Sequence, residues 1–216
     1  MKIELDSYRS RSLSGDELCV AAAFLHLPCL YGVSGEWIRS SRAGLKDRVT
    51  GITAGLENRG ILLAEPGGVV RMEAGLHDIL GVMGRAGRVG RVCFSRDGGE
   101  GRFCLYQDKA DLVFMEPDAR GSCHLGRLPG IGTLRRGLLE PPKADAGDGG
   151  KGAGDGFLSL DSAEEWLGAL VFQEREGRFF ERVFDLAWTR ESAEELRAAW
   201  SRLCDALEYG GEESGI

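Results

Sequence analysis

Histidine and cysteine supply most nucleophilic and metal-binding chemistry in proteins, and both are scattered in this sequence. The three histidines include one that adjoins a cysteine, in the pair Cys123–His124. Neighbouring residues on a strand point to opposite faces, so we expect no thiolate–imidazole pair there. His26 ends an apolar helix, and His77 lies on a connecting helix without an obvious chemical partner. The histidines therefore predict neither a catalytic centre nor a metal centre.

The sequence motifs of common enzymes and nucleotide-binding proteins are also missing. No H-E-x-x-H, G-x-S-x-G, Walker or Rossmann pattern occurs. Residues 143–156 are rich in glycine, but they lack the Gly-Lys-Ser/Thr ending, and their aspartates would repel phosphate. The acid pairs Glu164–Glu165 and Glu194–Glu195 fall in the first turns of predicted helices, where the helix dipole explains them. We therefore expect a protein that is not an enzyme and that uses no cofactor and no metal.

The cysteines and the distribution of apolar residues indicate where in the cell the protein is located. The six cysteines lie far apart and form no C-x-x-C pair, which favours reduced thiols in a core. The first eight residues lack the apolar stretch of a signal peptide. No apolar run approaches the roughly 20 residues of a membrane span. These observations predict a cytoplasmic protein without a membrane span.

The charge distribution argues against nucleic acid as the main partner. The net charge of -7 is uneven along the chain. Residues 1–96 carry 13 Lys and Arg against 10 Asp and Glu, whereas residues 97–216 carry 14 against 24. The second part is therefore strongly acidic and would repel phosphate, while the first part is only mildly basic.

The N-terminal part predicts three helices followed by a β-hairpin. Ser14 and Glu17 have capping-box spacing, and the helix that they open is apolar almost all round, so we expect it to be buried on most sides. Gly60 is placed to end the third helix. The order of elements is that of a winged helix-turn-helix. The expected elements are a strand over 2–8, helices over 18–27, 35–42 and 43–58, and a hairpin over 61–72 around a Pro-Gly-Gly turn.

A winged helix would contact DNA through its third helix and its wing. Arg42, Lys46 and Arg48 are the cations of that helix, but acids accompany them. The wing tip begins with Glu65, and Arg71 is the one cation on the hairpin. A phosphate-binding wing should not begin with a carboxylate, so we expect no specific binding of duplex DNA. A DNA-binding transcriptional regulator remains the alternative function.

The rest of the chain predicts a sheet and further helices, which gives an α+β fold with a central antiparallel sheet and flanking helices. A helix over 76–83 leads into four short β-rich runs and a helix over 131–139. Strands over 157–160 and 178–188 alternate with helices over 162–172 and from 192, which capping boxes open. The last helix has one apolar stripe, formed by Leu196, Trp200, Leu203 and Leu207. The expected divisions are a winged-helix-like subdomain (1–85), an antiparallel meander plus helix (86–142), a flexible Gly/Asp-rich loop (143–156), a strand–helix–strand–helix part (157–209) and a tail (210–216).

Taken in order, these features resemble the EspG-like family of type VII (ESX) secretion-associated proteins. The resemblance rests on Leu13–Leu18 opening an apolar helix, the wing-like Leu56–Leu62, the meander from Val89 to Leu125, and the helix Leu134–Leu139 with its proline end. It implies a cytoplasmic chaperone or adaptor that keeps helical-hairpin export substrates soluble before they reach the secretion ATPase. The family has no catalytic residues to carry over. The winged-helix-like opening departs from its mycobacterial members.

Aromatic residues gather in the last third of the chain, where three of the four tryptophans lie after residue 160. An apolar patch with an acidic rim would suit a helical protein partner. Packing in the core is the alternative role of each of these side chains. The residues predicted to bind a small helical secreted protein are Trp166, Leu170, Phe172, Trp188 and Trp200.

Overall fold

The computed structural model describes residues 11–27, 30–33, 44–96, 99–117, 121–128, 130–132, 134–135, 165–175, 179–187 and 193–209. In the two strands over 165–187 the description covers the backbone alone. The predicted strand over 2–8, the helix over 35–42, the loop over 143–156, the strand over 157–160 and the tail over 210–216 lie outside these residues. The helix predicted from residue 131 is described only in part.

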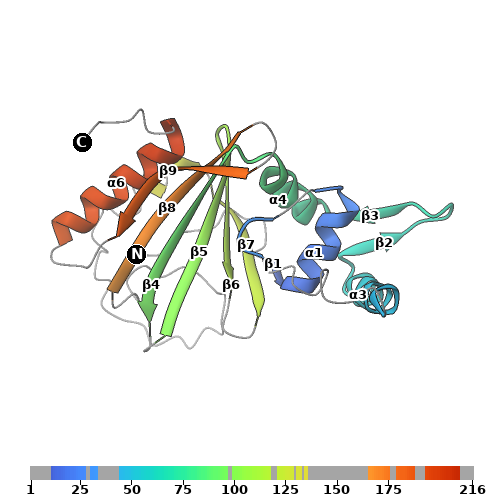
Figure 1. Ribbon diagram of the computed structural model, residues 1–216. Helices are drawn as coiled ribbons and strands as arrows, with labels where there is room; N and C mark the ends of the chain where they lie inside the picture. The colour runs from blue at the N-terminus through green and yellow to red at the C-terminus, as the bar shows by residue number, and fades with distance from the viewer. Residues whose placement is uncertain are drawn as a thin grey trace, which may run out of the picture.

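A seven-stranded antiparallel sheet forms the centre of the fold (Figure 1). Its strand order is β1-β7-β6-β5-β4-β8-β9. The four consecutive strands from β4 to β7 are the predicted meander, and each is longer than the β-rich run that indicated it. The fold is therefore α+β, as predicted. The strands are β1 (Arg11–Ser14), β4 (Arg88–Arg96), β5 (Gly99–Asp108), β6 (Asp111–Pro117), β7 (Ser122–Leu128), β8 (Glu165–Arg175) and β9 (Phe179–Ala187).

The start of helix α1 and the end of helix α3 lie at the signals that predicted them, whereas α1 ends at Phe24, before the predicted residue 27. At the start of α1 (Gly15–Phe24), the Glu17 N–H donates to Ser14 Oγ at 3.1 Å, and the Ser14 N–H donates to Glu17 Oε2 at 2.9 Å. This is the predicted capping box. Helix α3 (Leu45–Asn58) ends just before Gly60, whose φ of +67° lies in the left-handed region.

A small hairpin follows α3 and leads to the next helix. Strands β2 (Leu62–Ala64) and β3 (Val70–Met72) form the predicted hairpin, and α4 (Ala74–Arg85) is the predicted connecting helix. In Figure 1, α3 and this hairpin lie at the end of the molecule away from the C-terminal helix. The winged-helix arrangement is not confirmed, because its second helix lies outside the described residues. Moreover, β1 pairs with β7, so this region is joined to the central sheet.

Alternation along the strands gives the sheet two apolar faces. On one face Cys104, Tyr106 and Met115 belong to the core cluster that includes α1, α3 and α4. On the other face Phe103 and Phe114 lie with ring centroids 6.2 Å apart. Adjacent residues on a strand point to opposite sides of the sheet. The two sets of side chains therefore pack against different helices. The structure thus has helices on both sides of one sheet.

The prediction of a helix over residues 162–172 is wrong. Residues 165–175 form strand β8, which pairs with β4 on one side and with β9 on the other. The seven residues from Trp166 to Phe172 form an unbroken apolar run. Such a run fits a buried strand as well as a buried helix, and periodicity alone does not separate the two. Pairing with two neighbouring strands outweighs the helix-start signal that precedes this run.

The last helix, α6 (Ala193–Tyr209), covers the second face of the sheet. Its predicted apolar stripe is confirmed at Trp200, Leu203 and Leu207, which are all buried. Close approach is possible because Gly90 of β4 has no side chain: a Cβ at that position would lie 3.3 Å from Leu207. Helix α6 is therefore packed tightly on β4. Among the described helices, none combines the length and apolar character needed to cross a bilayer.

Two buried thiols make the stability of this fold sensitive to alkaline pH. Burial raises the pKa of the Cys104 thiol from 9.0 to about 12, and it raises the pKa of Cys204 by the same amount. Above pH 9 the unfolded thiols lose protons that the folded thiols keep. Stability is then full below pH 9 and falls as the pH rises toward 12.

We expect the free energy of unfolding, measured by urea denaturation across that pH window, to fall less steeply for the variant Cys104→Ala/Cys204→Ala than for the unchanged chain. Lysine and tyrosine titration is common to both proteins, so the difference in slope isolates the two thiols. Equal slopes would contradict the prediction.

Candidate functional site

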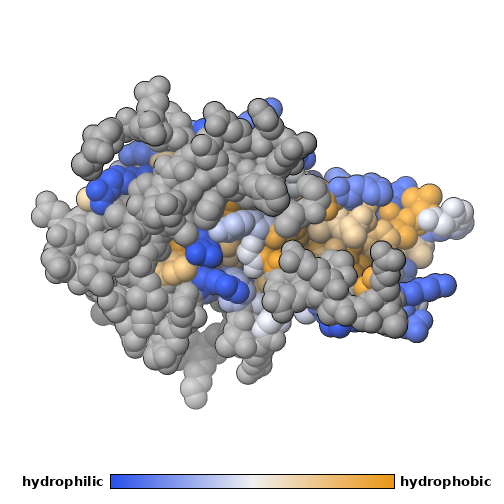
Figure 2. Space-filling model, viewed as in Figure 1, coloured by the Kyte–Doolittle hydropathy of each residue, from blue (hydrophilic) through white to orange (hydrophobic). Residues whose placement is uncertain are grey.

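An apolar groove opens between α1 and α3. Its volume is about 440 Å³, and its walls are Cys19, Val20, Ala23, Phe24, His26, Leu45 and Val49. In Figure 2, apolar side chains gather to the right of the centre of the view, over α1 and the hairpin. The name apolar groove is kept below for these residues. Apolar side chains make up most of its lining.

Phe24 joins the apolar groove to a second hollow. That hollow lies between the end of α1, the hairpin and α4, and it is lined mainly by apolar residues such as Leu62 and Met72. Phe24 lines both, and it is 39% exposed. Leu63 (53%) and Val69 (54%) are also exposed, on the hairpin, but they line neither hollow. Most exposed large apolar side chains of the described residues thus lie in this N-terminal region.

The sequence of α1 explains why this surface is apolar. The helix has apolar residues almost all round, so the core buries one side while another side remains uncovered. Leu18, Ala21 and Ala22 are buried, as predicted, whereas Ala23 and Phe24 are exposed. The prediction that the helix is buried on most sides is therefore wrong for its last turn. The last turn of α1 is apolar and lies at the surface, whereas the sequence analysis placed it in the core.

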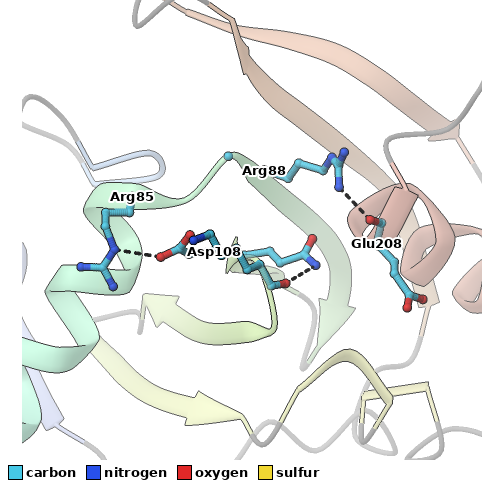
Figure 3. Close-up of a pocket in the computed structure, with 7 residues that line it drawn as sticks. Arg85, Arg88, Asp108 and Glu208 are labelled. Carbon is cyan, nitrogen blue, oxygen red and sulfur yellow. Dashed lines mark hydrogen bonds and ion pairs between the residues drawn. The ribbon is translucent and has the colours of Figure 1, made fainter.

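A second site is polar, and it lies at the opposite end of α4. A pocket of about 300 Å³ opens where α4 ends, where β4 begins and where β5 turns into β6. Figure 3 shows Arg85 pointing from α4 toward Asp108, and Arg88 pointing from β4 toward the end of α6 at Glu208. The remaining lining residues are Gly87, Gln107 and Lys109. We call this the polar pocket.

The charges around the polar pocket are held by specific bonds. Arg85 Nε donates to Asp108 Oδ2 at 2.8 Å. Arg88 Nη1 donates to the carbonyl oxygens of Leu207 and Glu208, at 2.9 and 2.8 Å. A cation at a helix C-terminus satisfies orphan carbonyls and interacts favourably with the helix dipole. Arg88 therefore fixes the end of α6 against the sheet.

Two buried polar atoms, on residues that line the polar pocket, lack a hydrogen-bond partner. They are Arg88 Nε, a donor, and Gln107 Oε1, an acceptor. Arg88 and Gln107 are register partners on β4 and β5, so the two atoms come from neighbouring side chains on one face. Gln107 is only 8% exposed, and its Nε2 donates to the carbonyl of Lys109 at 3.0 Å. An unpartnered buried polar atom is costly, so each needs an explanation.

Two of the cations that a winged helix would use on DNA are already in ion pairs, while Lys46 is exposed on α3. Arg48 of α3 pairs with Asp16, and Arg71 of β3 pairs with Glu65 at 2.8 Å. Arg59 lies 2.8 Å from Glu17. Arg42 lies outside the described residues. These carboxylates compete directly with phosphate for the arginines, so the N-terminal region is poorly suited to the DNA backbone.

Of the predicted partner-binding residues, Trp200 alone has a described side chain, and it is buried. Trp166, Leu170 and Phe172 lie on β8, and only their backbone is described. Trp188 lies outside the described residues. Trp200 is 2% exposed, and its Nε1 donates to the Leu134 carbonyl at 3.0 Å. Trp200 therefore packs in the core and joins α6 to the residues near 134. This is the alternative role that the sequence analysis gave for it.

No metal centre is found in the part of the chain that the structure describes. Across residues 11–135 and 165–209, apart from the gaps noted above, no group of three His, Cys, Asp or Glu side chains is arranged to hold an ion. Compared with known proteins, the chain matches no protein-family model and no curated protein. The resemblance to the EspG-like family rests on the sequence features that indicated it.

Proposed function

We propose that this chain is a protein-binding adaptor that covers the apolar stripe of a helical partner, in the manner of a type VII (ESX) secretion chaperone. The observation that supports the proposal is the apolar groove between α1 and α3, with Phe24 exposed at its end. The partner in this proposal is a small helical-hairpin export substrate, and the encounter takes place in the cytoplasm.

The shape and chemistry of the apolar groove suit an amphipathic helix. Its walls are two helices, α1 and α3, and nearly all of its lining side chains are apolar. Helix-in-groove recognition uses apolar side chains spaced at one turn, which enter such a groove together. Lys46 and Asp47 on α3 are exposed beside Leu45, and they supply a charged edge that keeps the surface soluble when no partner is bound.

The alternative function, binding of duplex DNA, has less support. Arg48, Arg59 and Arg71 are paired with carboxylates of the same region. DNA binding would have to break these pairs before it gained contacts with phosphate. In contrast, the apolar groove would make no favourable contact with the charged phosphate backbone of DNA.

Binding of a helical export substrate should depend on Phe24. We expect Phe24→Glu to weaken binding at least about tenfold, because a buried carboxylate without a partner would face the apolar stripe of the bound helix. Leu63→Glu is the matched control, since Leu63 is more exposed than Phe24 and lines neither hollow. The measurement is a titration of each purified variant with a helical-hairpin substrate of a type VII system, followed by calorimetry.

Circular dichroism of each variant checks that the fold is retained. Equal affinities for Phe24→Glu and Leu63→Glu would place the binding surface elsewhere. No binding of any helical substrate, together with tight specific binding of a duplex promoter fragment, would replace the adaptor with the regulator.

A further inference from the structure

The polar pocket has the features of a small-ligand site that is separate from the apolar groove. We propose that it binds a small zwitterion, a free acidic α-amino acid. The inference does not depend on the adaptor function, because the two sites share no lining residue.

The unpartnered atoms of Arg88 and Gln107, which both line the polar pocket, define what the ligand must offer. Gln107 Oε1 needs a donor, and Arg88 Nε needs an acceptor. Gln107 cannot turn its amide to remove the problem, because its Nε2 already donates to the Lys109 carbonyl. An ion that only accepts hydrogen bonds, such as sulfate, would leave Gln107 unsatisfied. A ligand with an ammonium beside a carboxylate satisfies both atoms.

The described lining residues favour a polar ligand over an apolar one. Of the seven residues around the polar pocket, six have polar or charged side chains and the seventh is Gly87. None of these side chains is aliphatic or aromatic, so an acyl chain would find no apolar wall there. The volume of about 300 Å³ lies at the small end of the range for ligand pockets. The ligand is therefore small and polar throughout.

The charge of the lining favours a ligand with one net negative charge. Arg85, Arg88 and Lys109 contribute three positive charges, and Asp108 and Glu208 contribute two negative charges, which leaves one positive charge. Glu208 also pairs with Arg135, which lies outside the lining, at 3.0 Å. Aspartate and glutamate carry the required single negative charge. In this arrangement their α-ammonium donates to Gln107 Oε1, their α-carboxylate accepts from Arg88 Nε, and their side-chain carboxylate faces Lys109.

Ligand binding at this position would also strengthen the docking of α6. Arg88 holds the last carbonyls of α6 through Nη1, and the proposed ligand bonds to Nε of the same guanidinium. A bound ligand fixes the orientation of that group. We therefore expect slower amide hydrogen exchange in the last turn of α6 when the ligand is present.

Calorimetry of the full chain with glutamate, aspartate, glutarate and inorganic phosphate tests the proposal. Glutamate or aspartate should bind with a Kd of about 1 mM or tighter. Glutarate has both carboxylates but lacks the ammonium, so it should bind about tenfold more weakly or worse, because it leaves Gln107 without a donor. Equal binding of glutarate and glutamate, or binding of phosphate alone, would overturn the assignment. Absence of any saturable heat would also overturn it, and an ordered water would then account for the two atoms.

Variants locate the site. Gln107→Leu keeps the volume of the side chain and removes the acceptor, and Lys109→Met removes a cation from the exposed rim, where the fold is least at risk. Both should lose about tenfold in affinity for glutamate or more. Lys46→Met, on the exposed face of α3, is the matched control and should bind as the unchanged chain does. Unchanged affinity in both Gln107→Leu and Lys109→Met would place glutamate elsewhere on the protein.

Discussion

Replacing Trp200 with alanine is expected to lower the free energy of unfolding by about 3–5 kcal/mol. The side chain is 2% exposed, and it lies with Leu203 and Leu207 on the face of α6 that packs on the sheet. Truncation leaves a large cavity there. It also removes the bond from Trp200 Nε1 to the Leu134 carbonyl. Urea denaturation of both proteins, monitored by circular dichroism, gives the two free energies.

A more conservative variant separates the two contributions. Trp200→Phe keeps most of the apolar bulk but has no N–H, so we expect it to cost about 1 kcal/mol for the hydrogen bond and a further small amount for the lost volume. A cost well below 1 kcal/mol for Trp200→Ala would mean that α6 contributes little to the cooperative unit. Because of these expected losses, Trp200 is unsuited to testing partner binding, and the exposed Phe24 is the better position.

Local signals in the sequence predicted most of the elements. The capping box at Ser14 and Glu17 forms both of its hydrogen bonds, because such a cap needs only residues three apart in the chain. The apolar stripe of α6 and the β-rich runs of the meander were readable for the same reason. Each of these patterns reports on one element and its own buried face.

Features that depend on distant segments were not predicted. Strand β8 was taken for a helix because the apolar run from Trp166 to Phe172 does not reveal that it pairs with both β4 and β9. The polar pocket joins residues near 85, 107 and 208. No spacing along the chain links these three segments. Gln107 gave one weak signal, as a polar residue directly after the apolar run Phe103–Tyr106.

Gly32 tests the contact between the segment after α1 and the central sheet. Its φ of +79° lies in the left-handed region, and a Cβ there would lie 2.8 Å from Cys104 Sγ and 3.1 Å from Met115 Cε. We expect Gly32→Ala to lower the free energy of unfolding by about 2–5 kcal/mol, the sum of about 1–2 for the backbone and about 1–3 for overpacking. Met115 has a flexible end that can move. Cys104 has a short side chain on a central strand, which limits its movement.

Gly60→Ala is the matched control for this prediction. Gly60 has a similar φ of +67°, and nothing lies within 4 Å of a Cβ at that position. It should therefore show only the backbone cost of about 1–2 kcal/mol. Urea denaturation of the two variants gives the packing cost as a difference. Equal losses would mean that residues 30–33 move away from Cys104 at little cost. A larger loss for Gly32→Ala would mean that this segment, whose Tyr31 carbonyl accepts a bond from the Tyr106 hydroxyl, is fixed on the sheet.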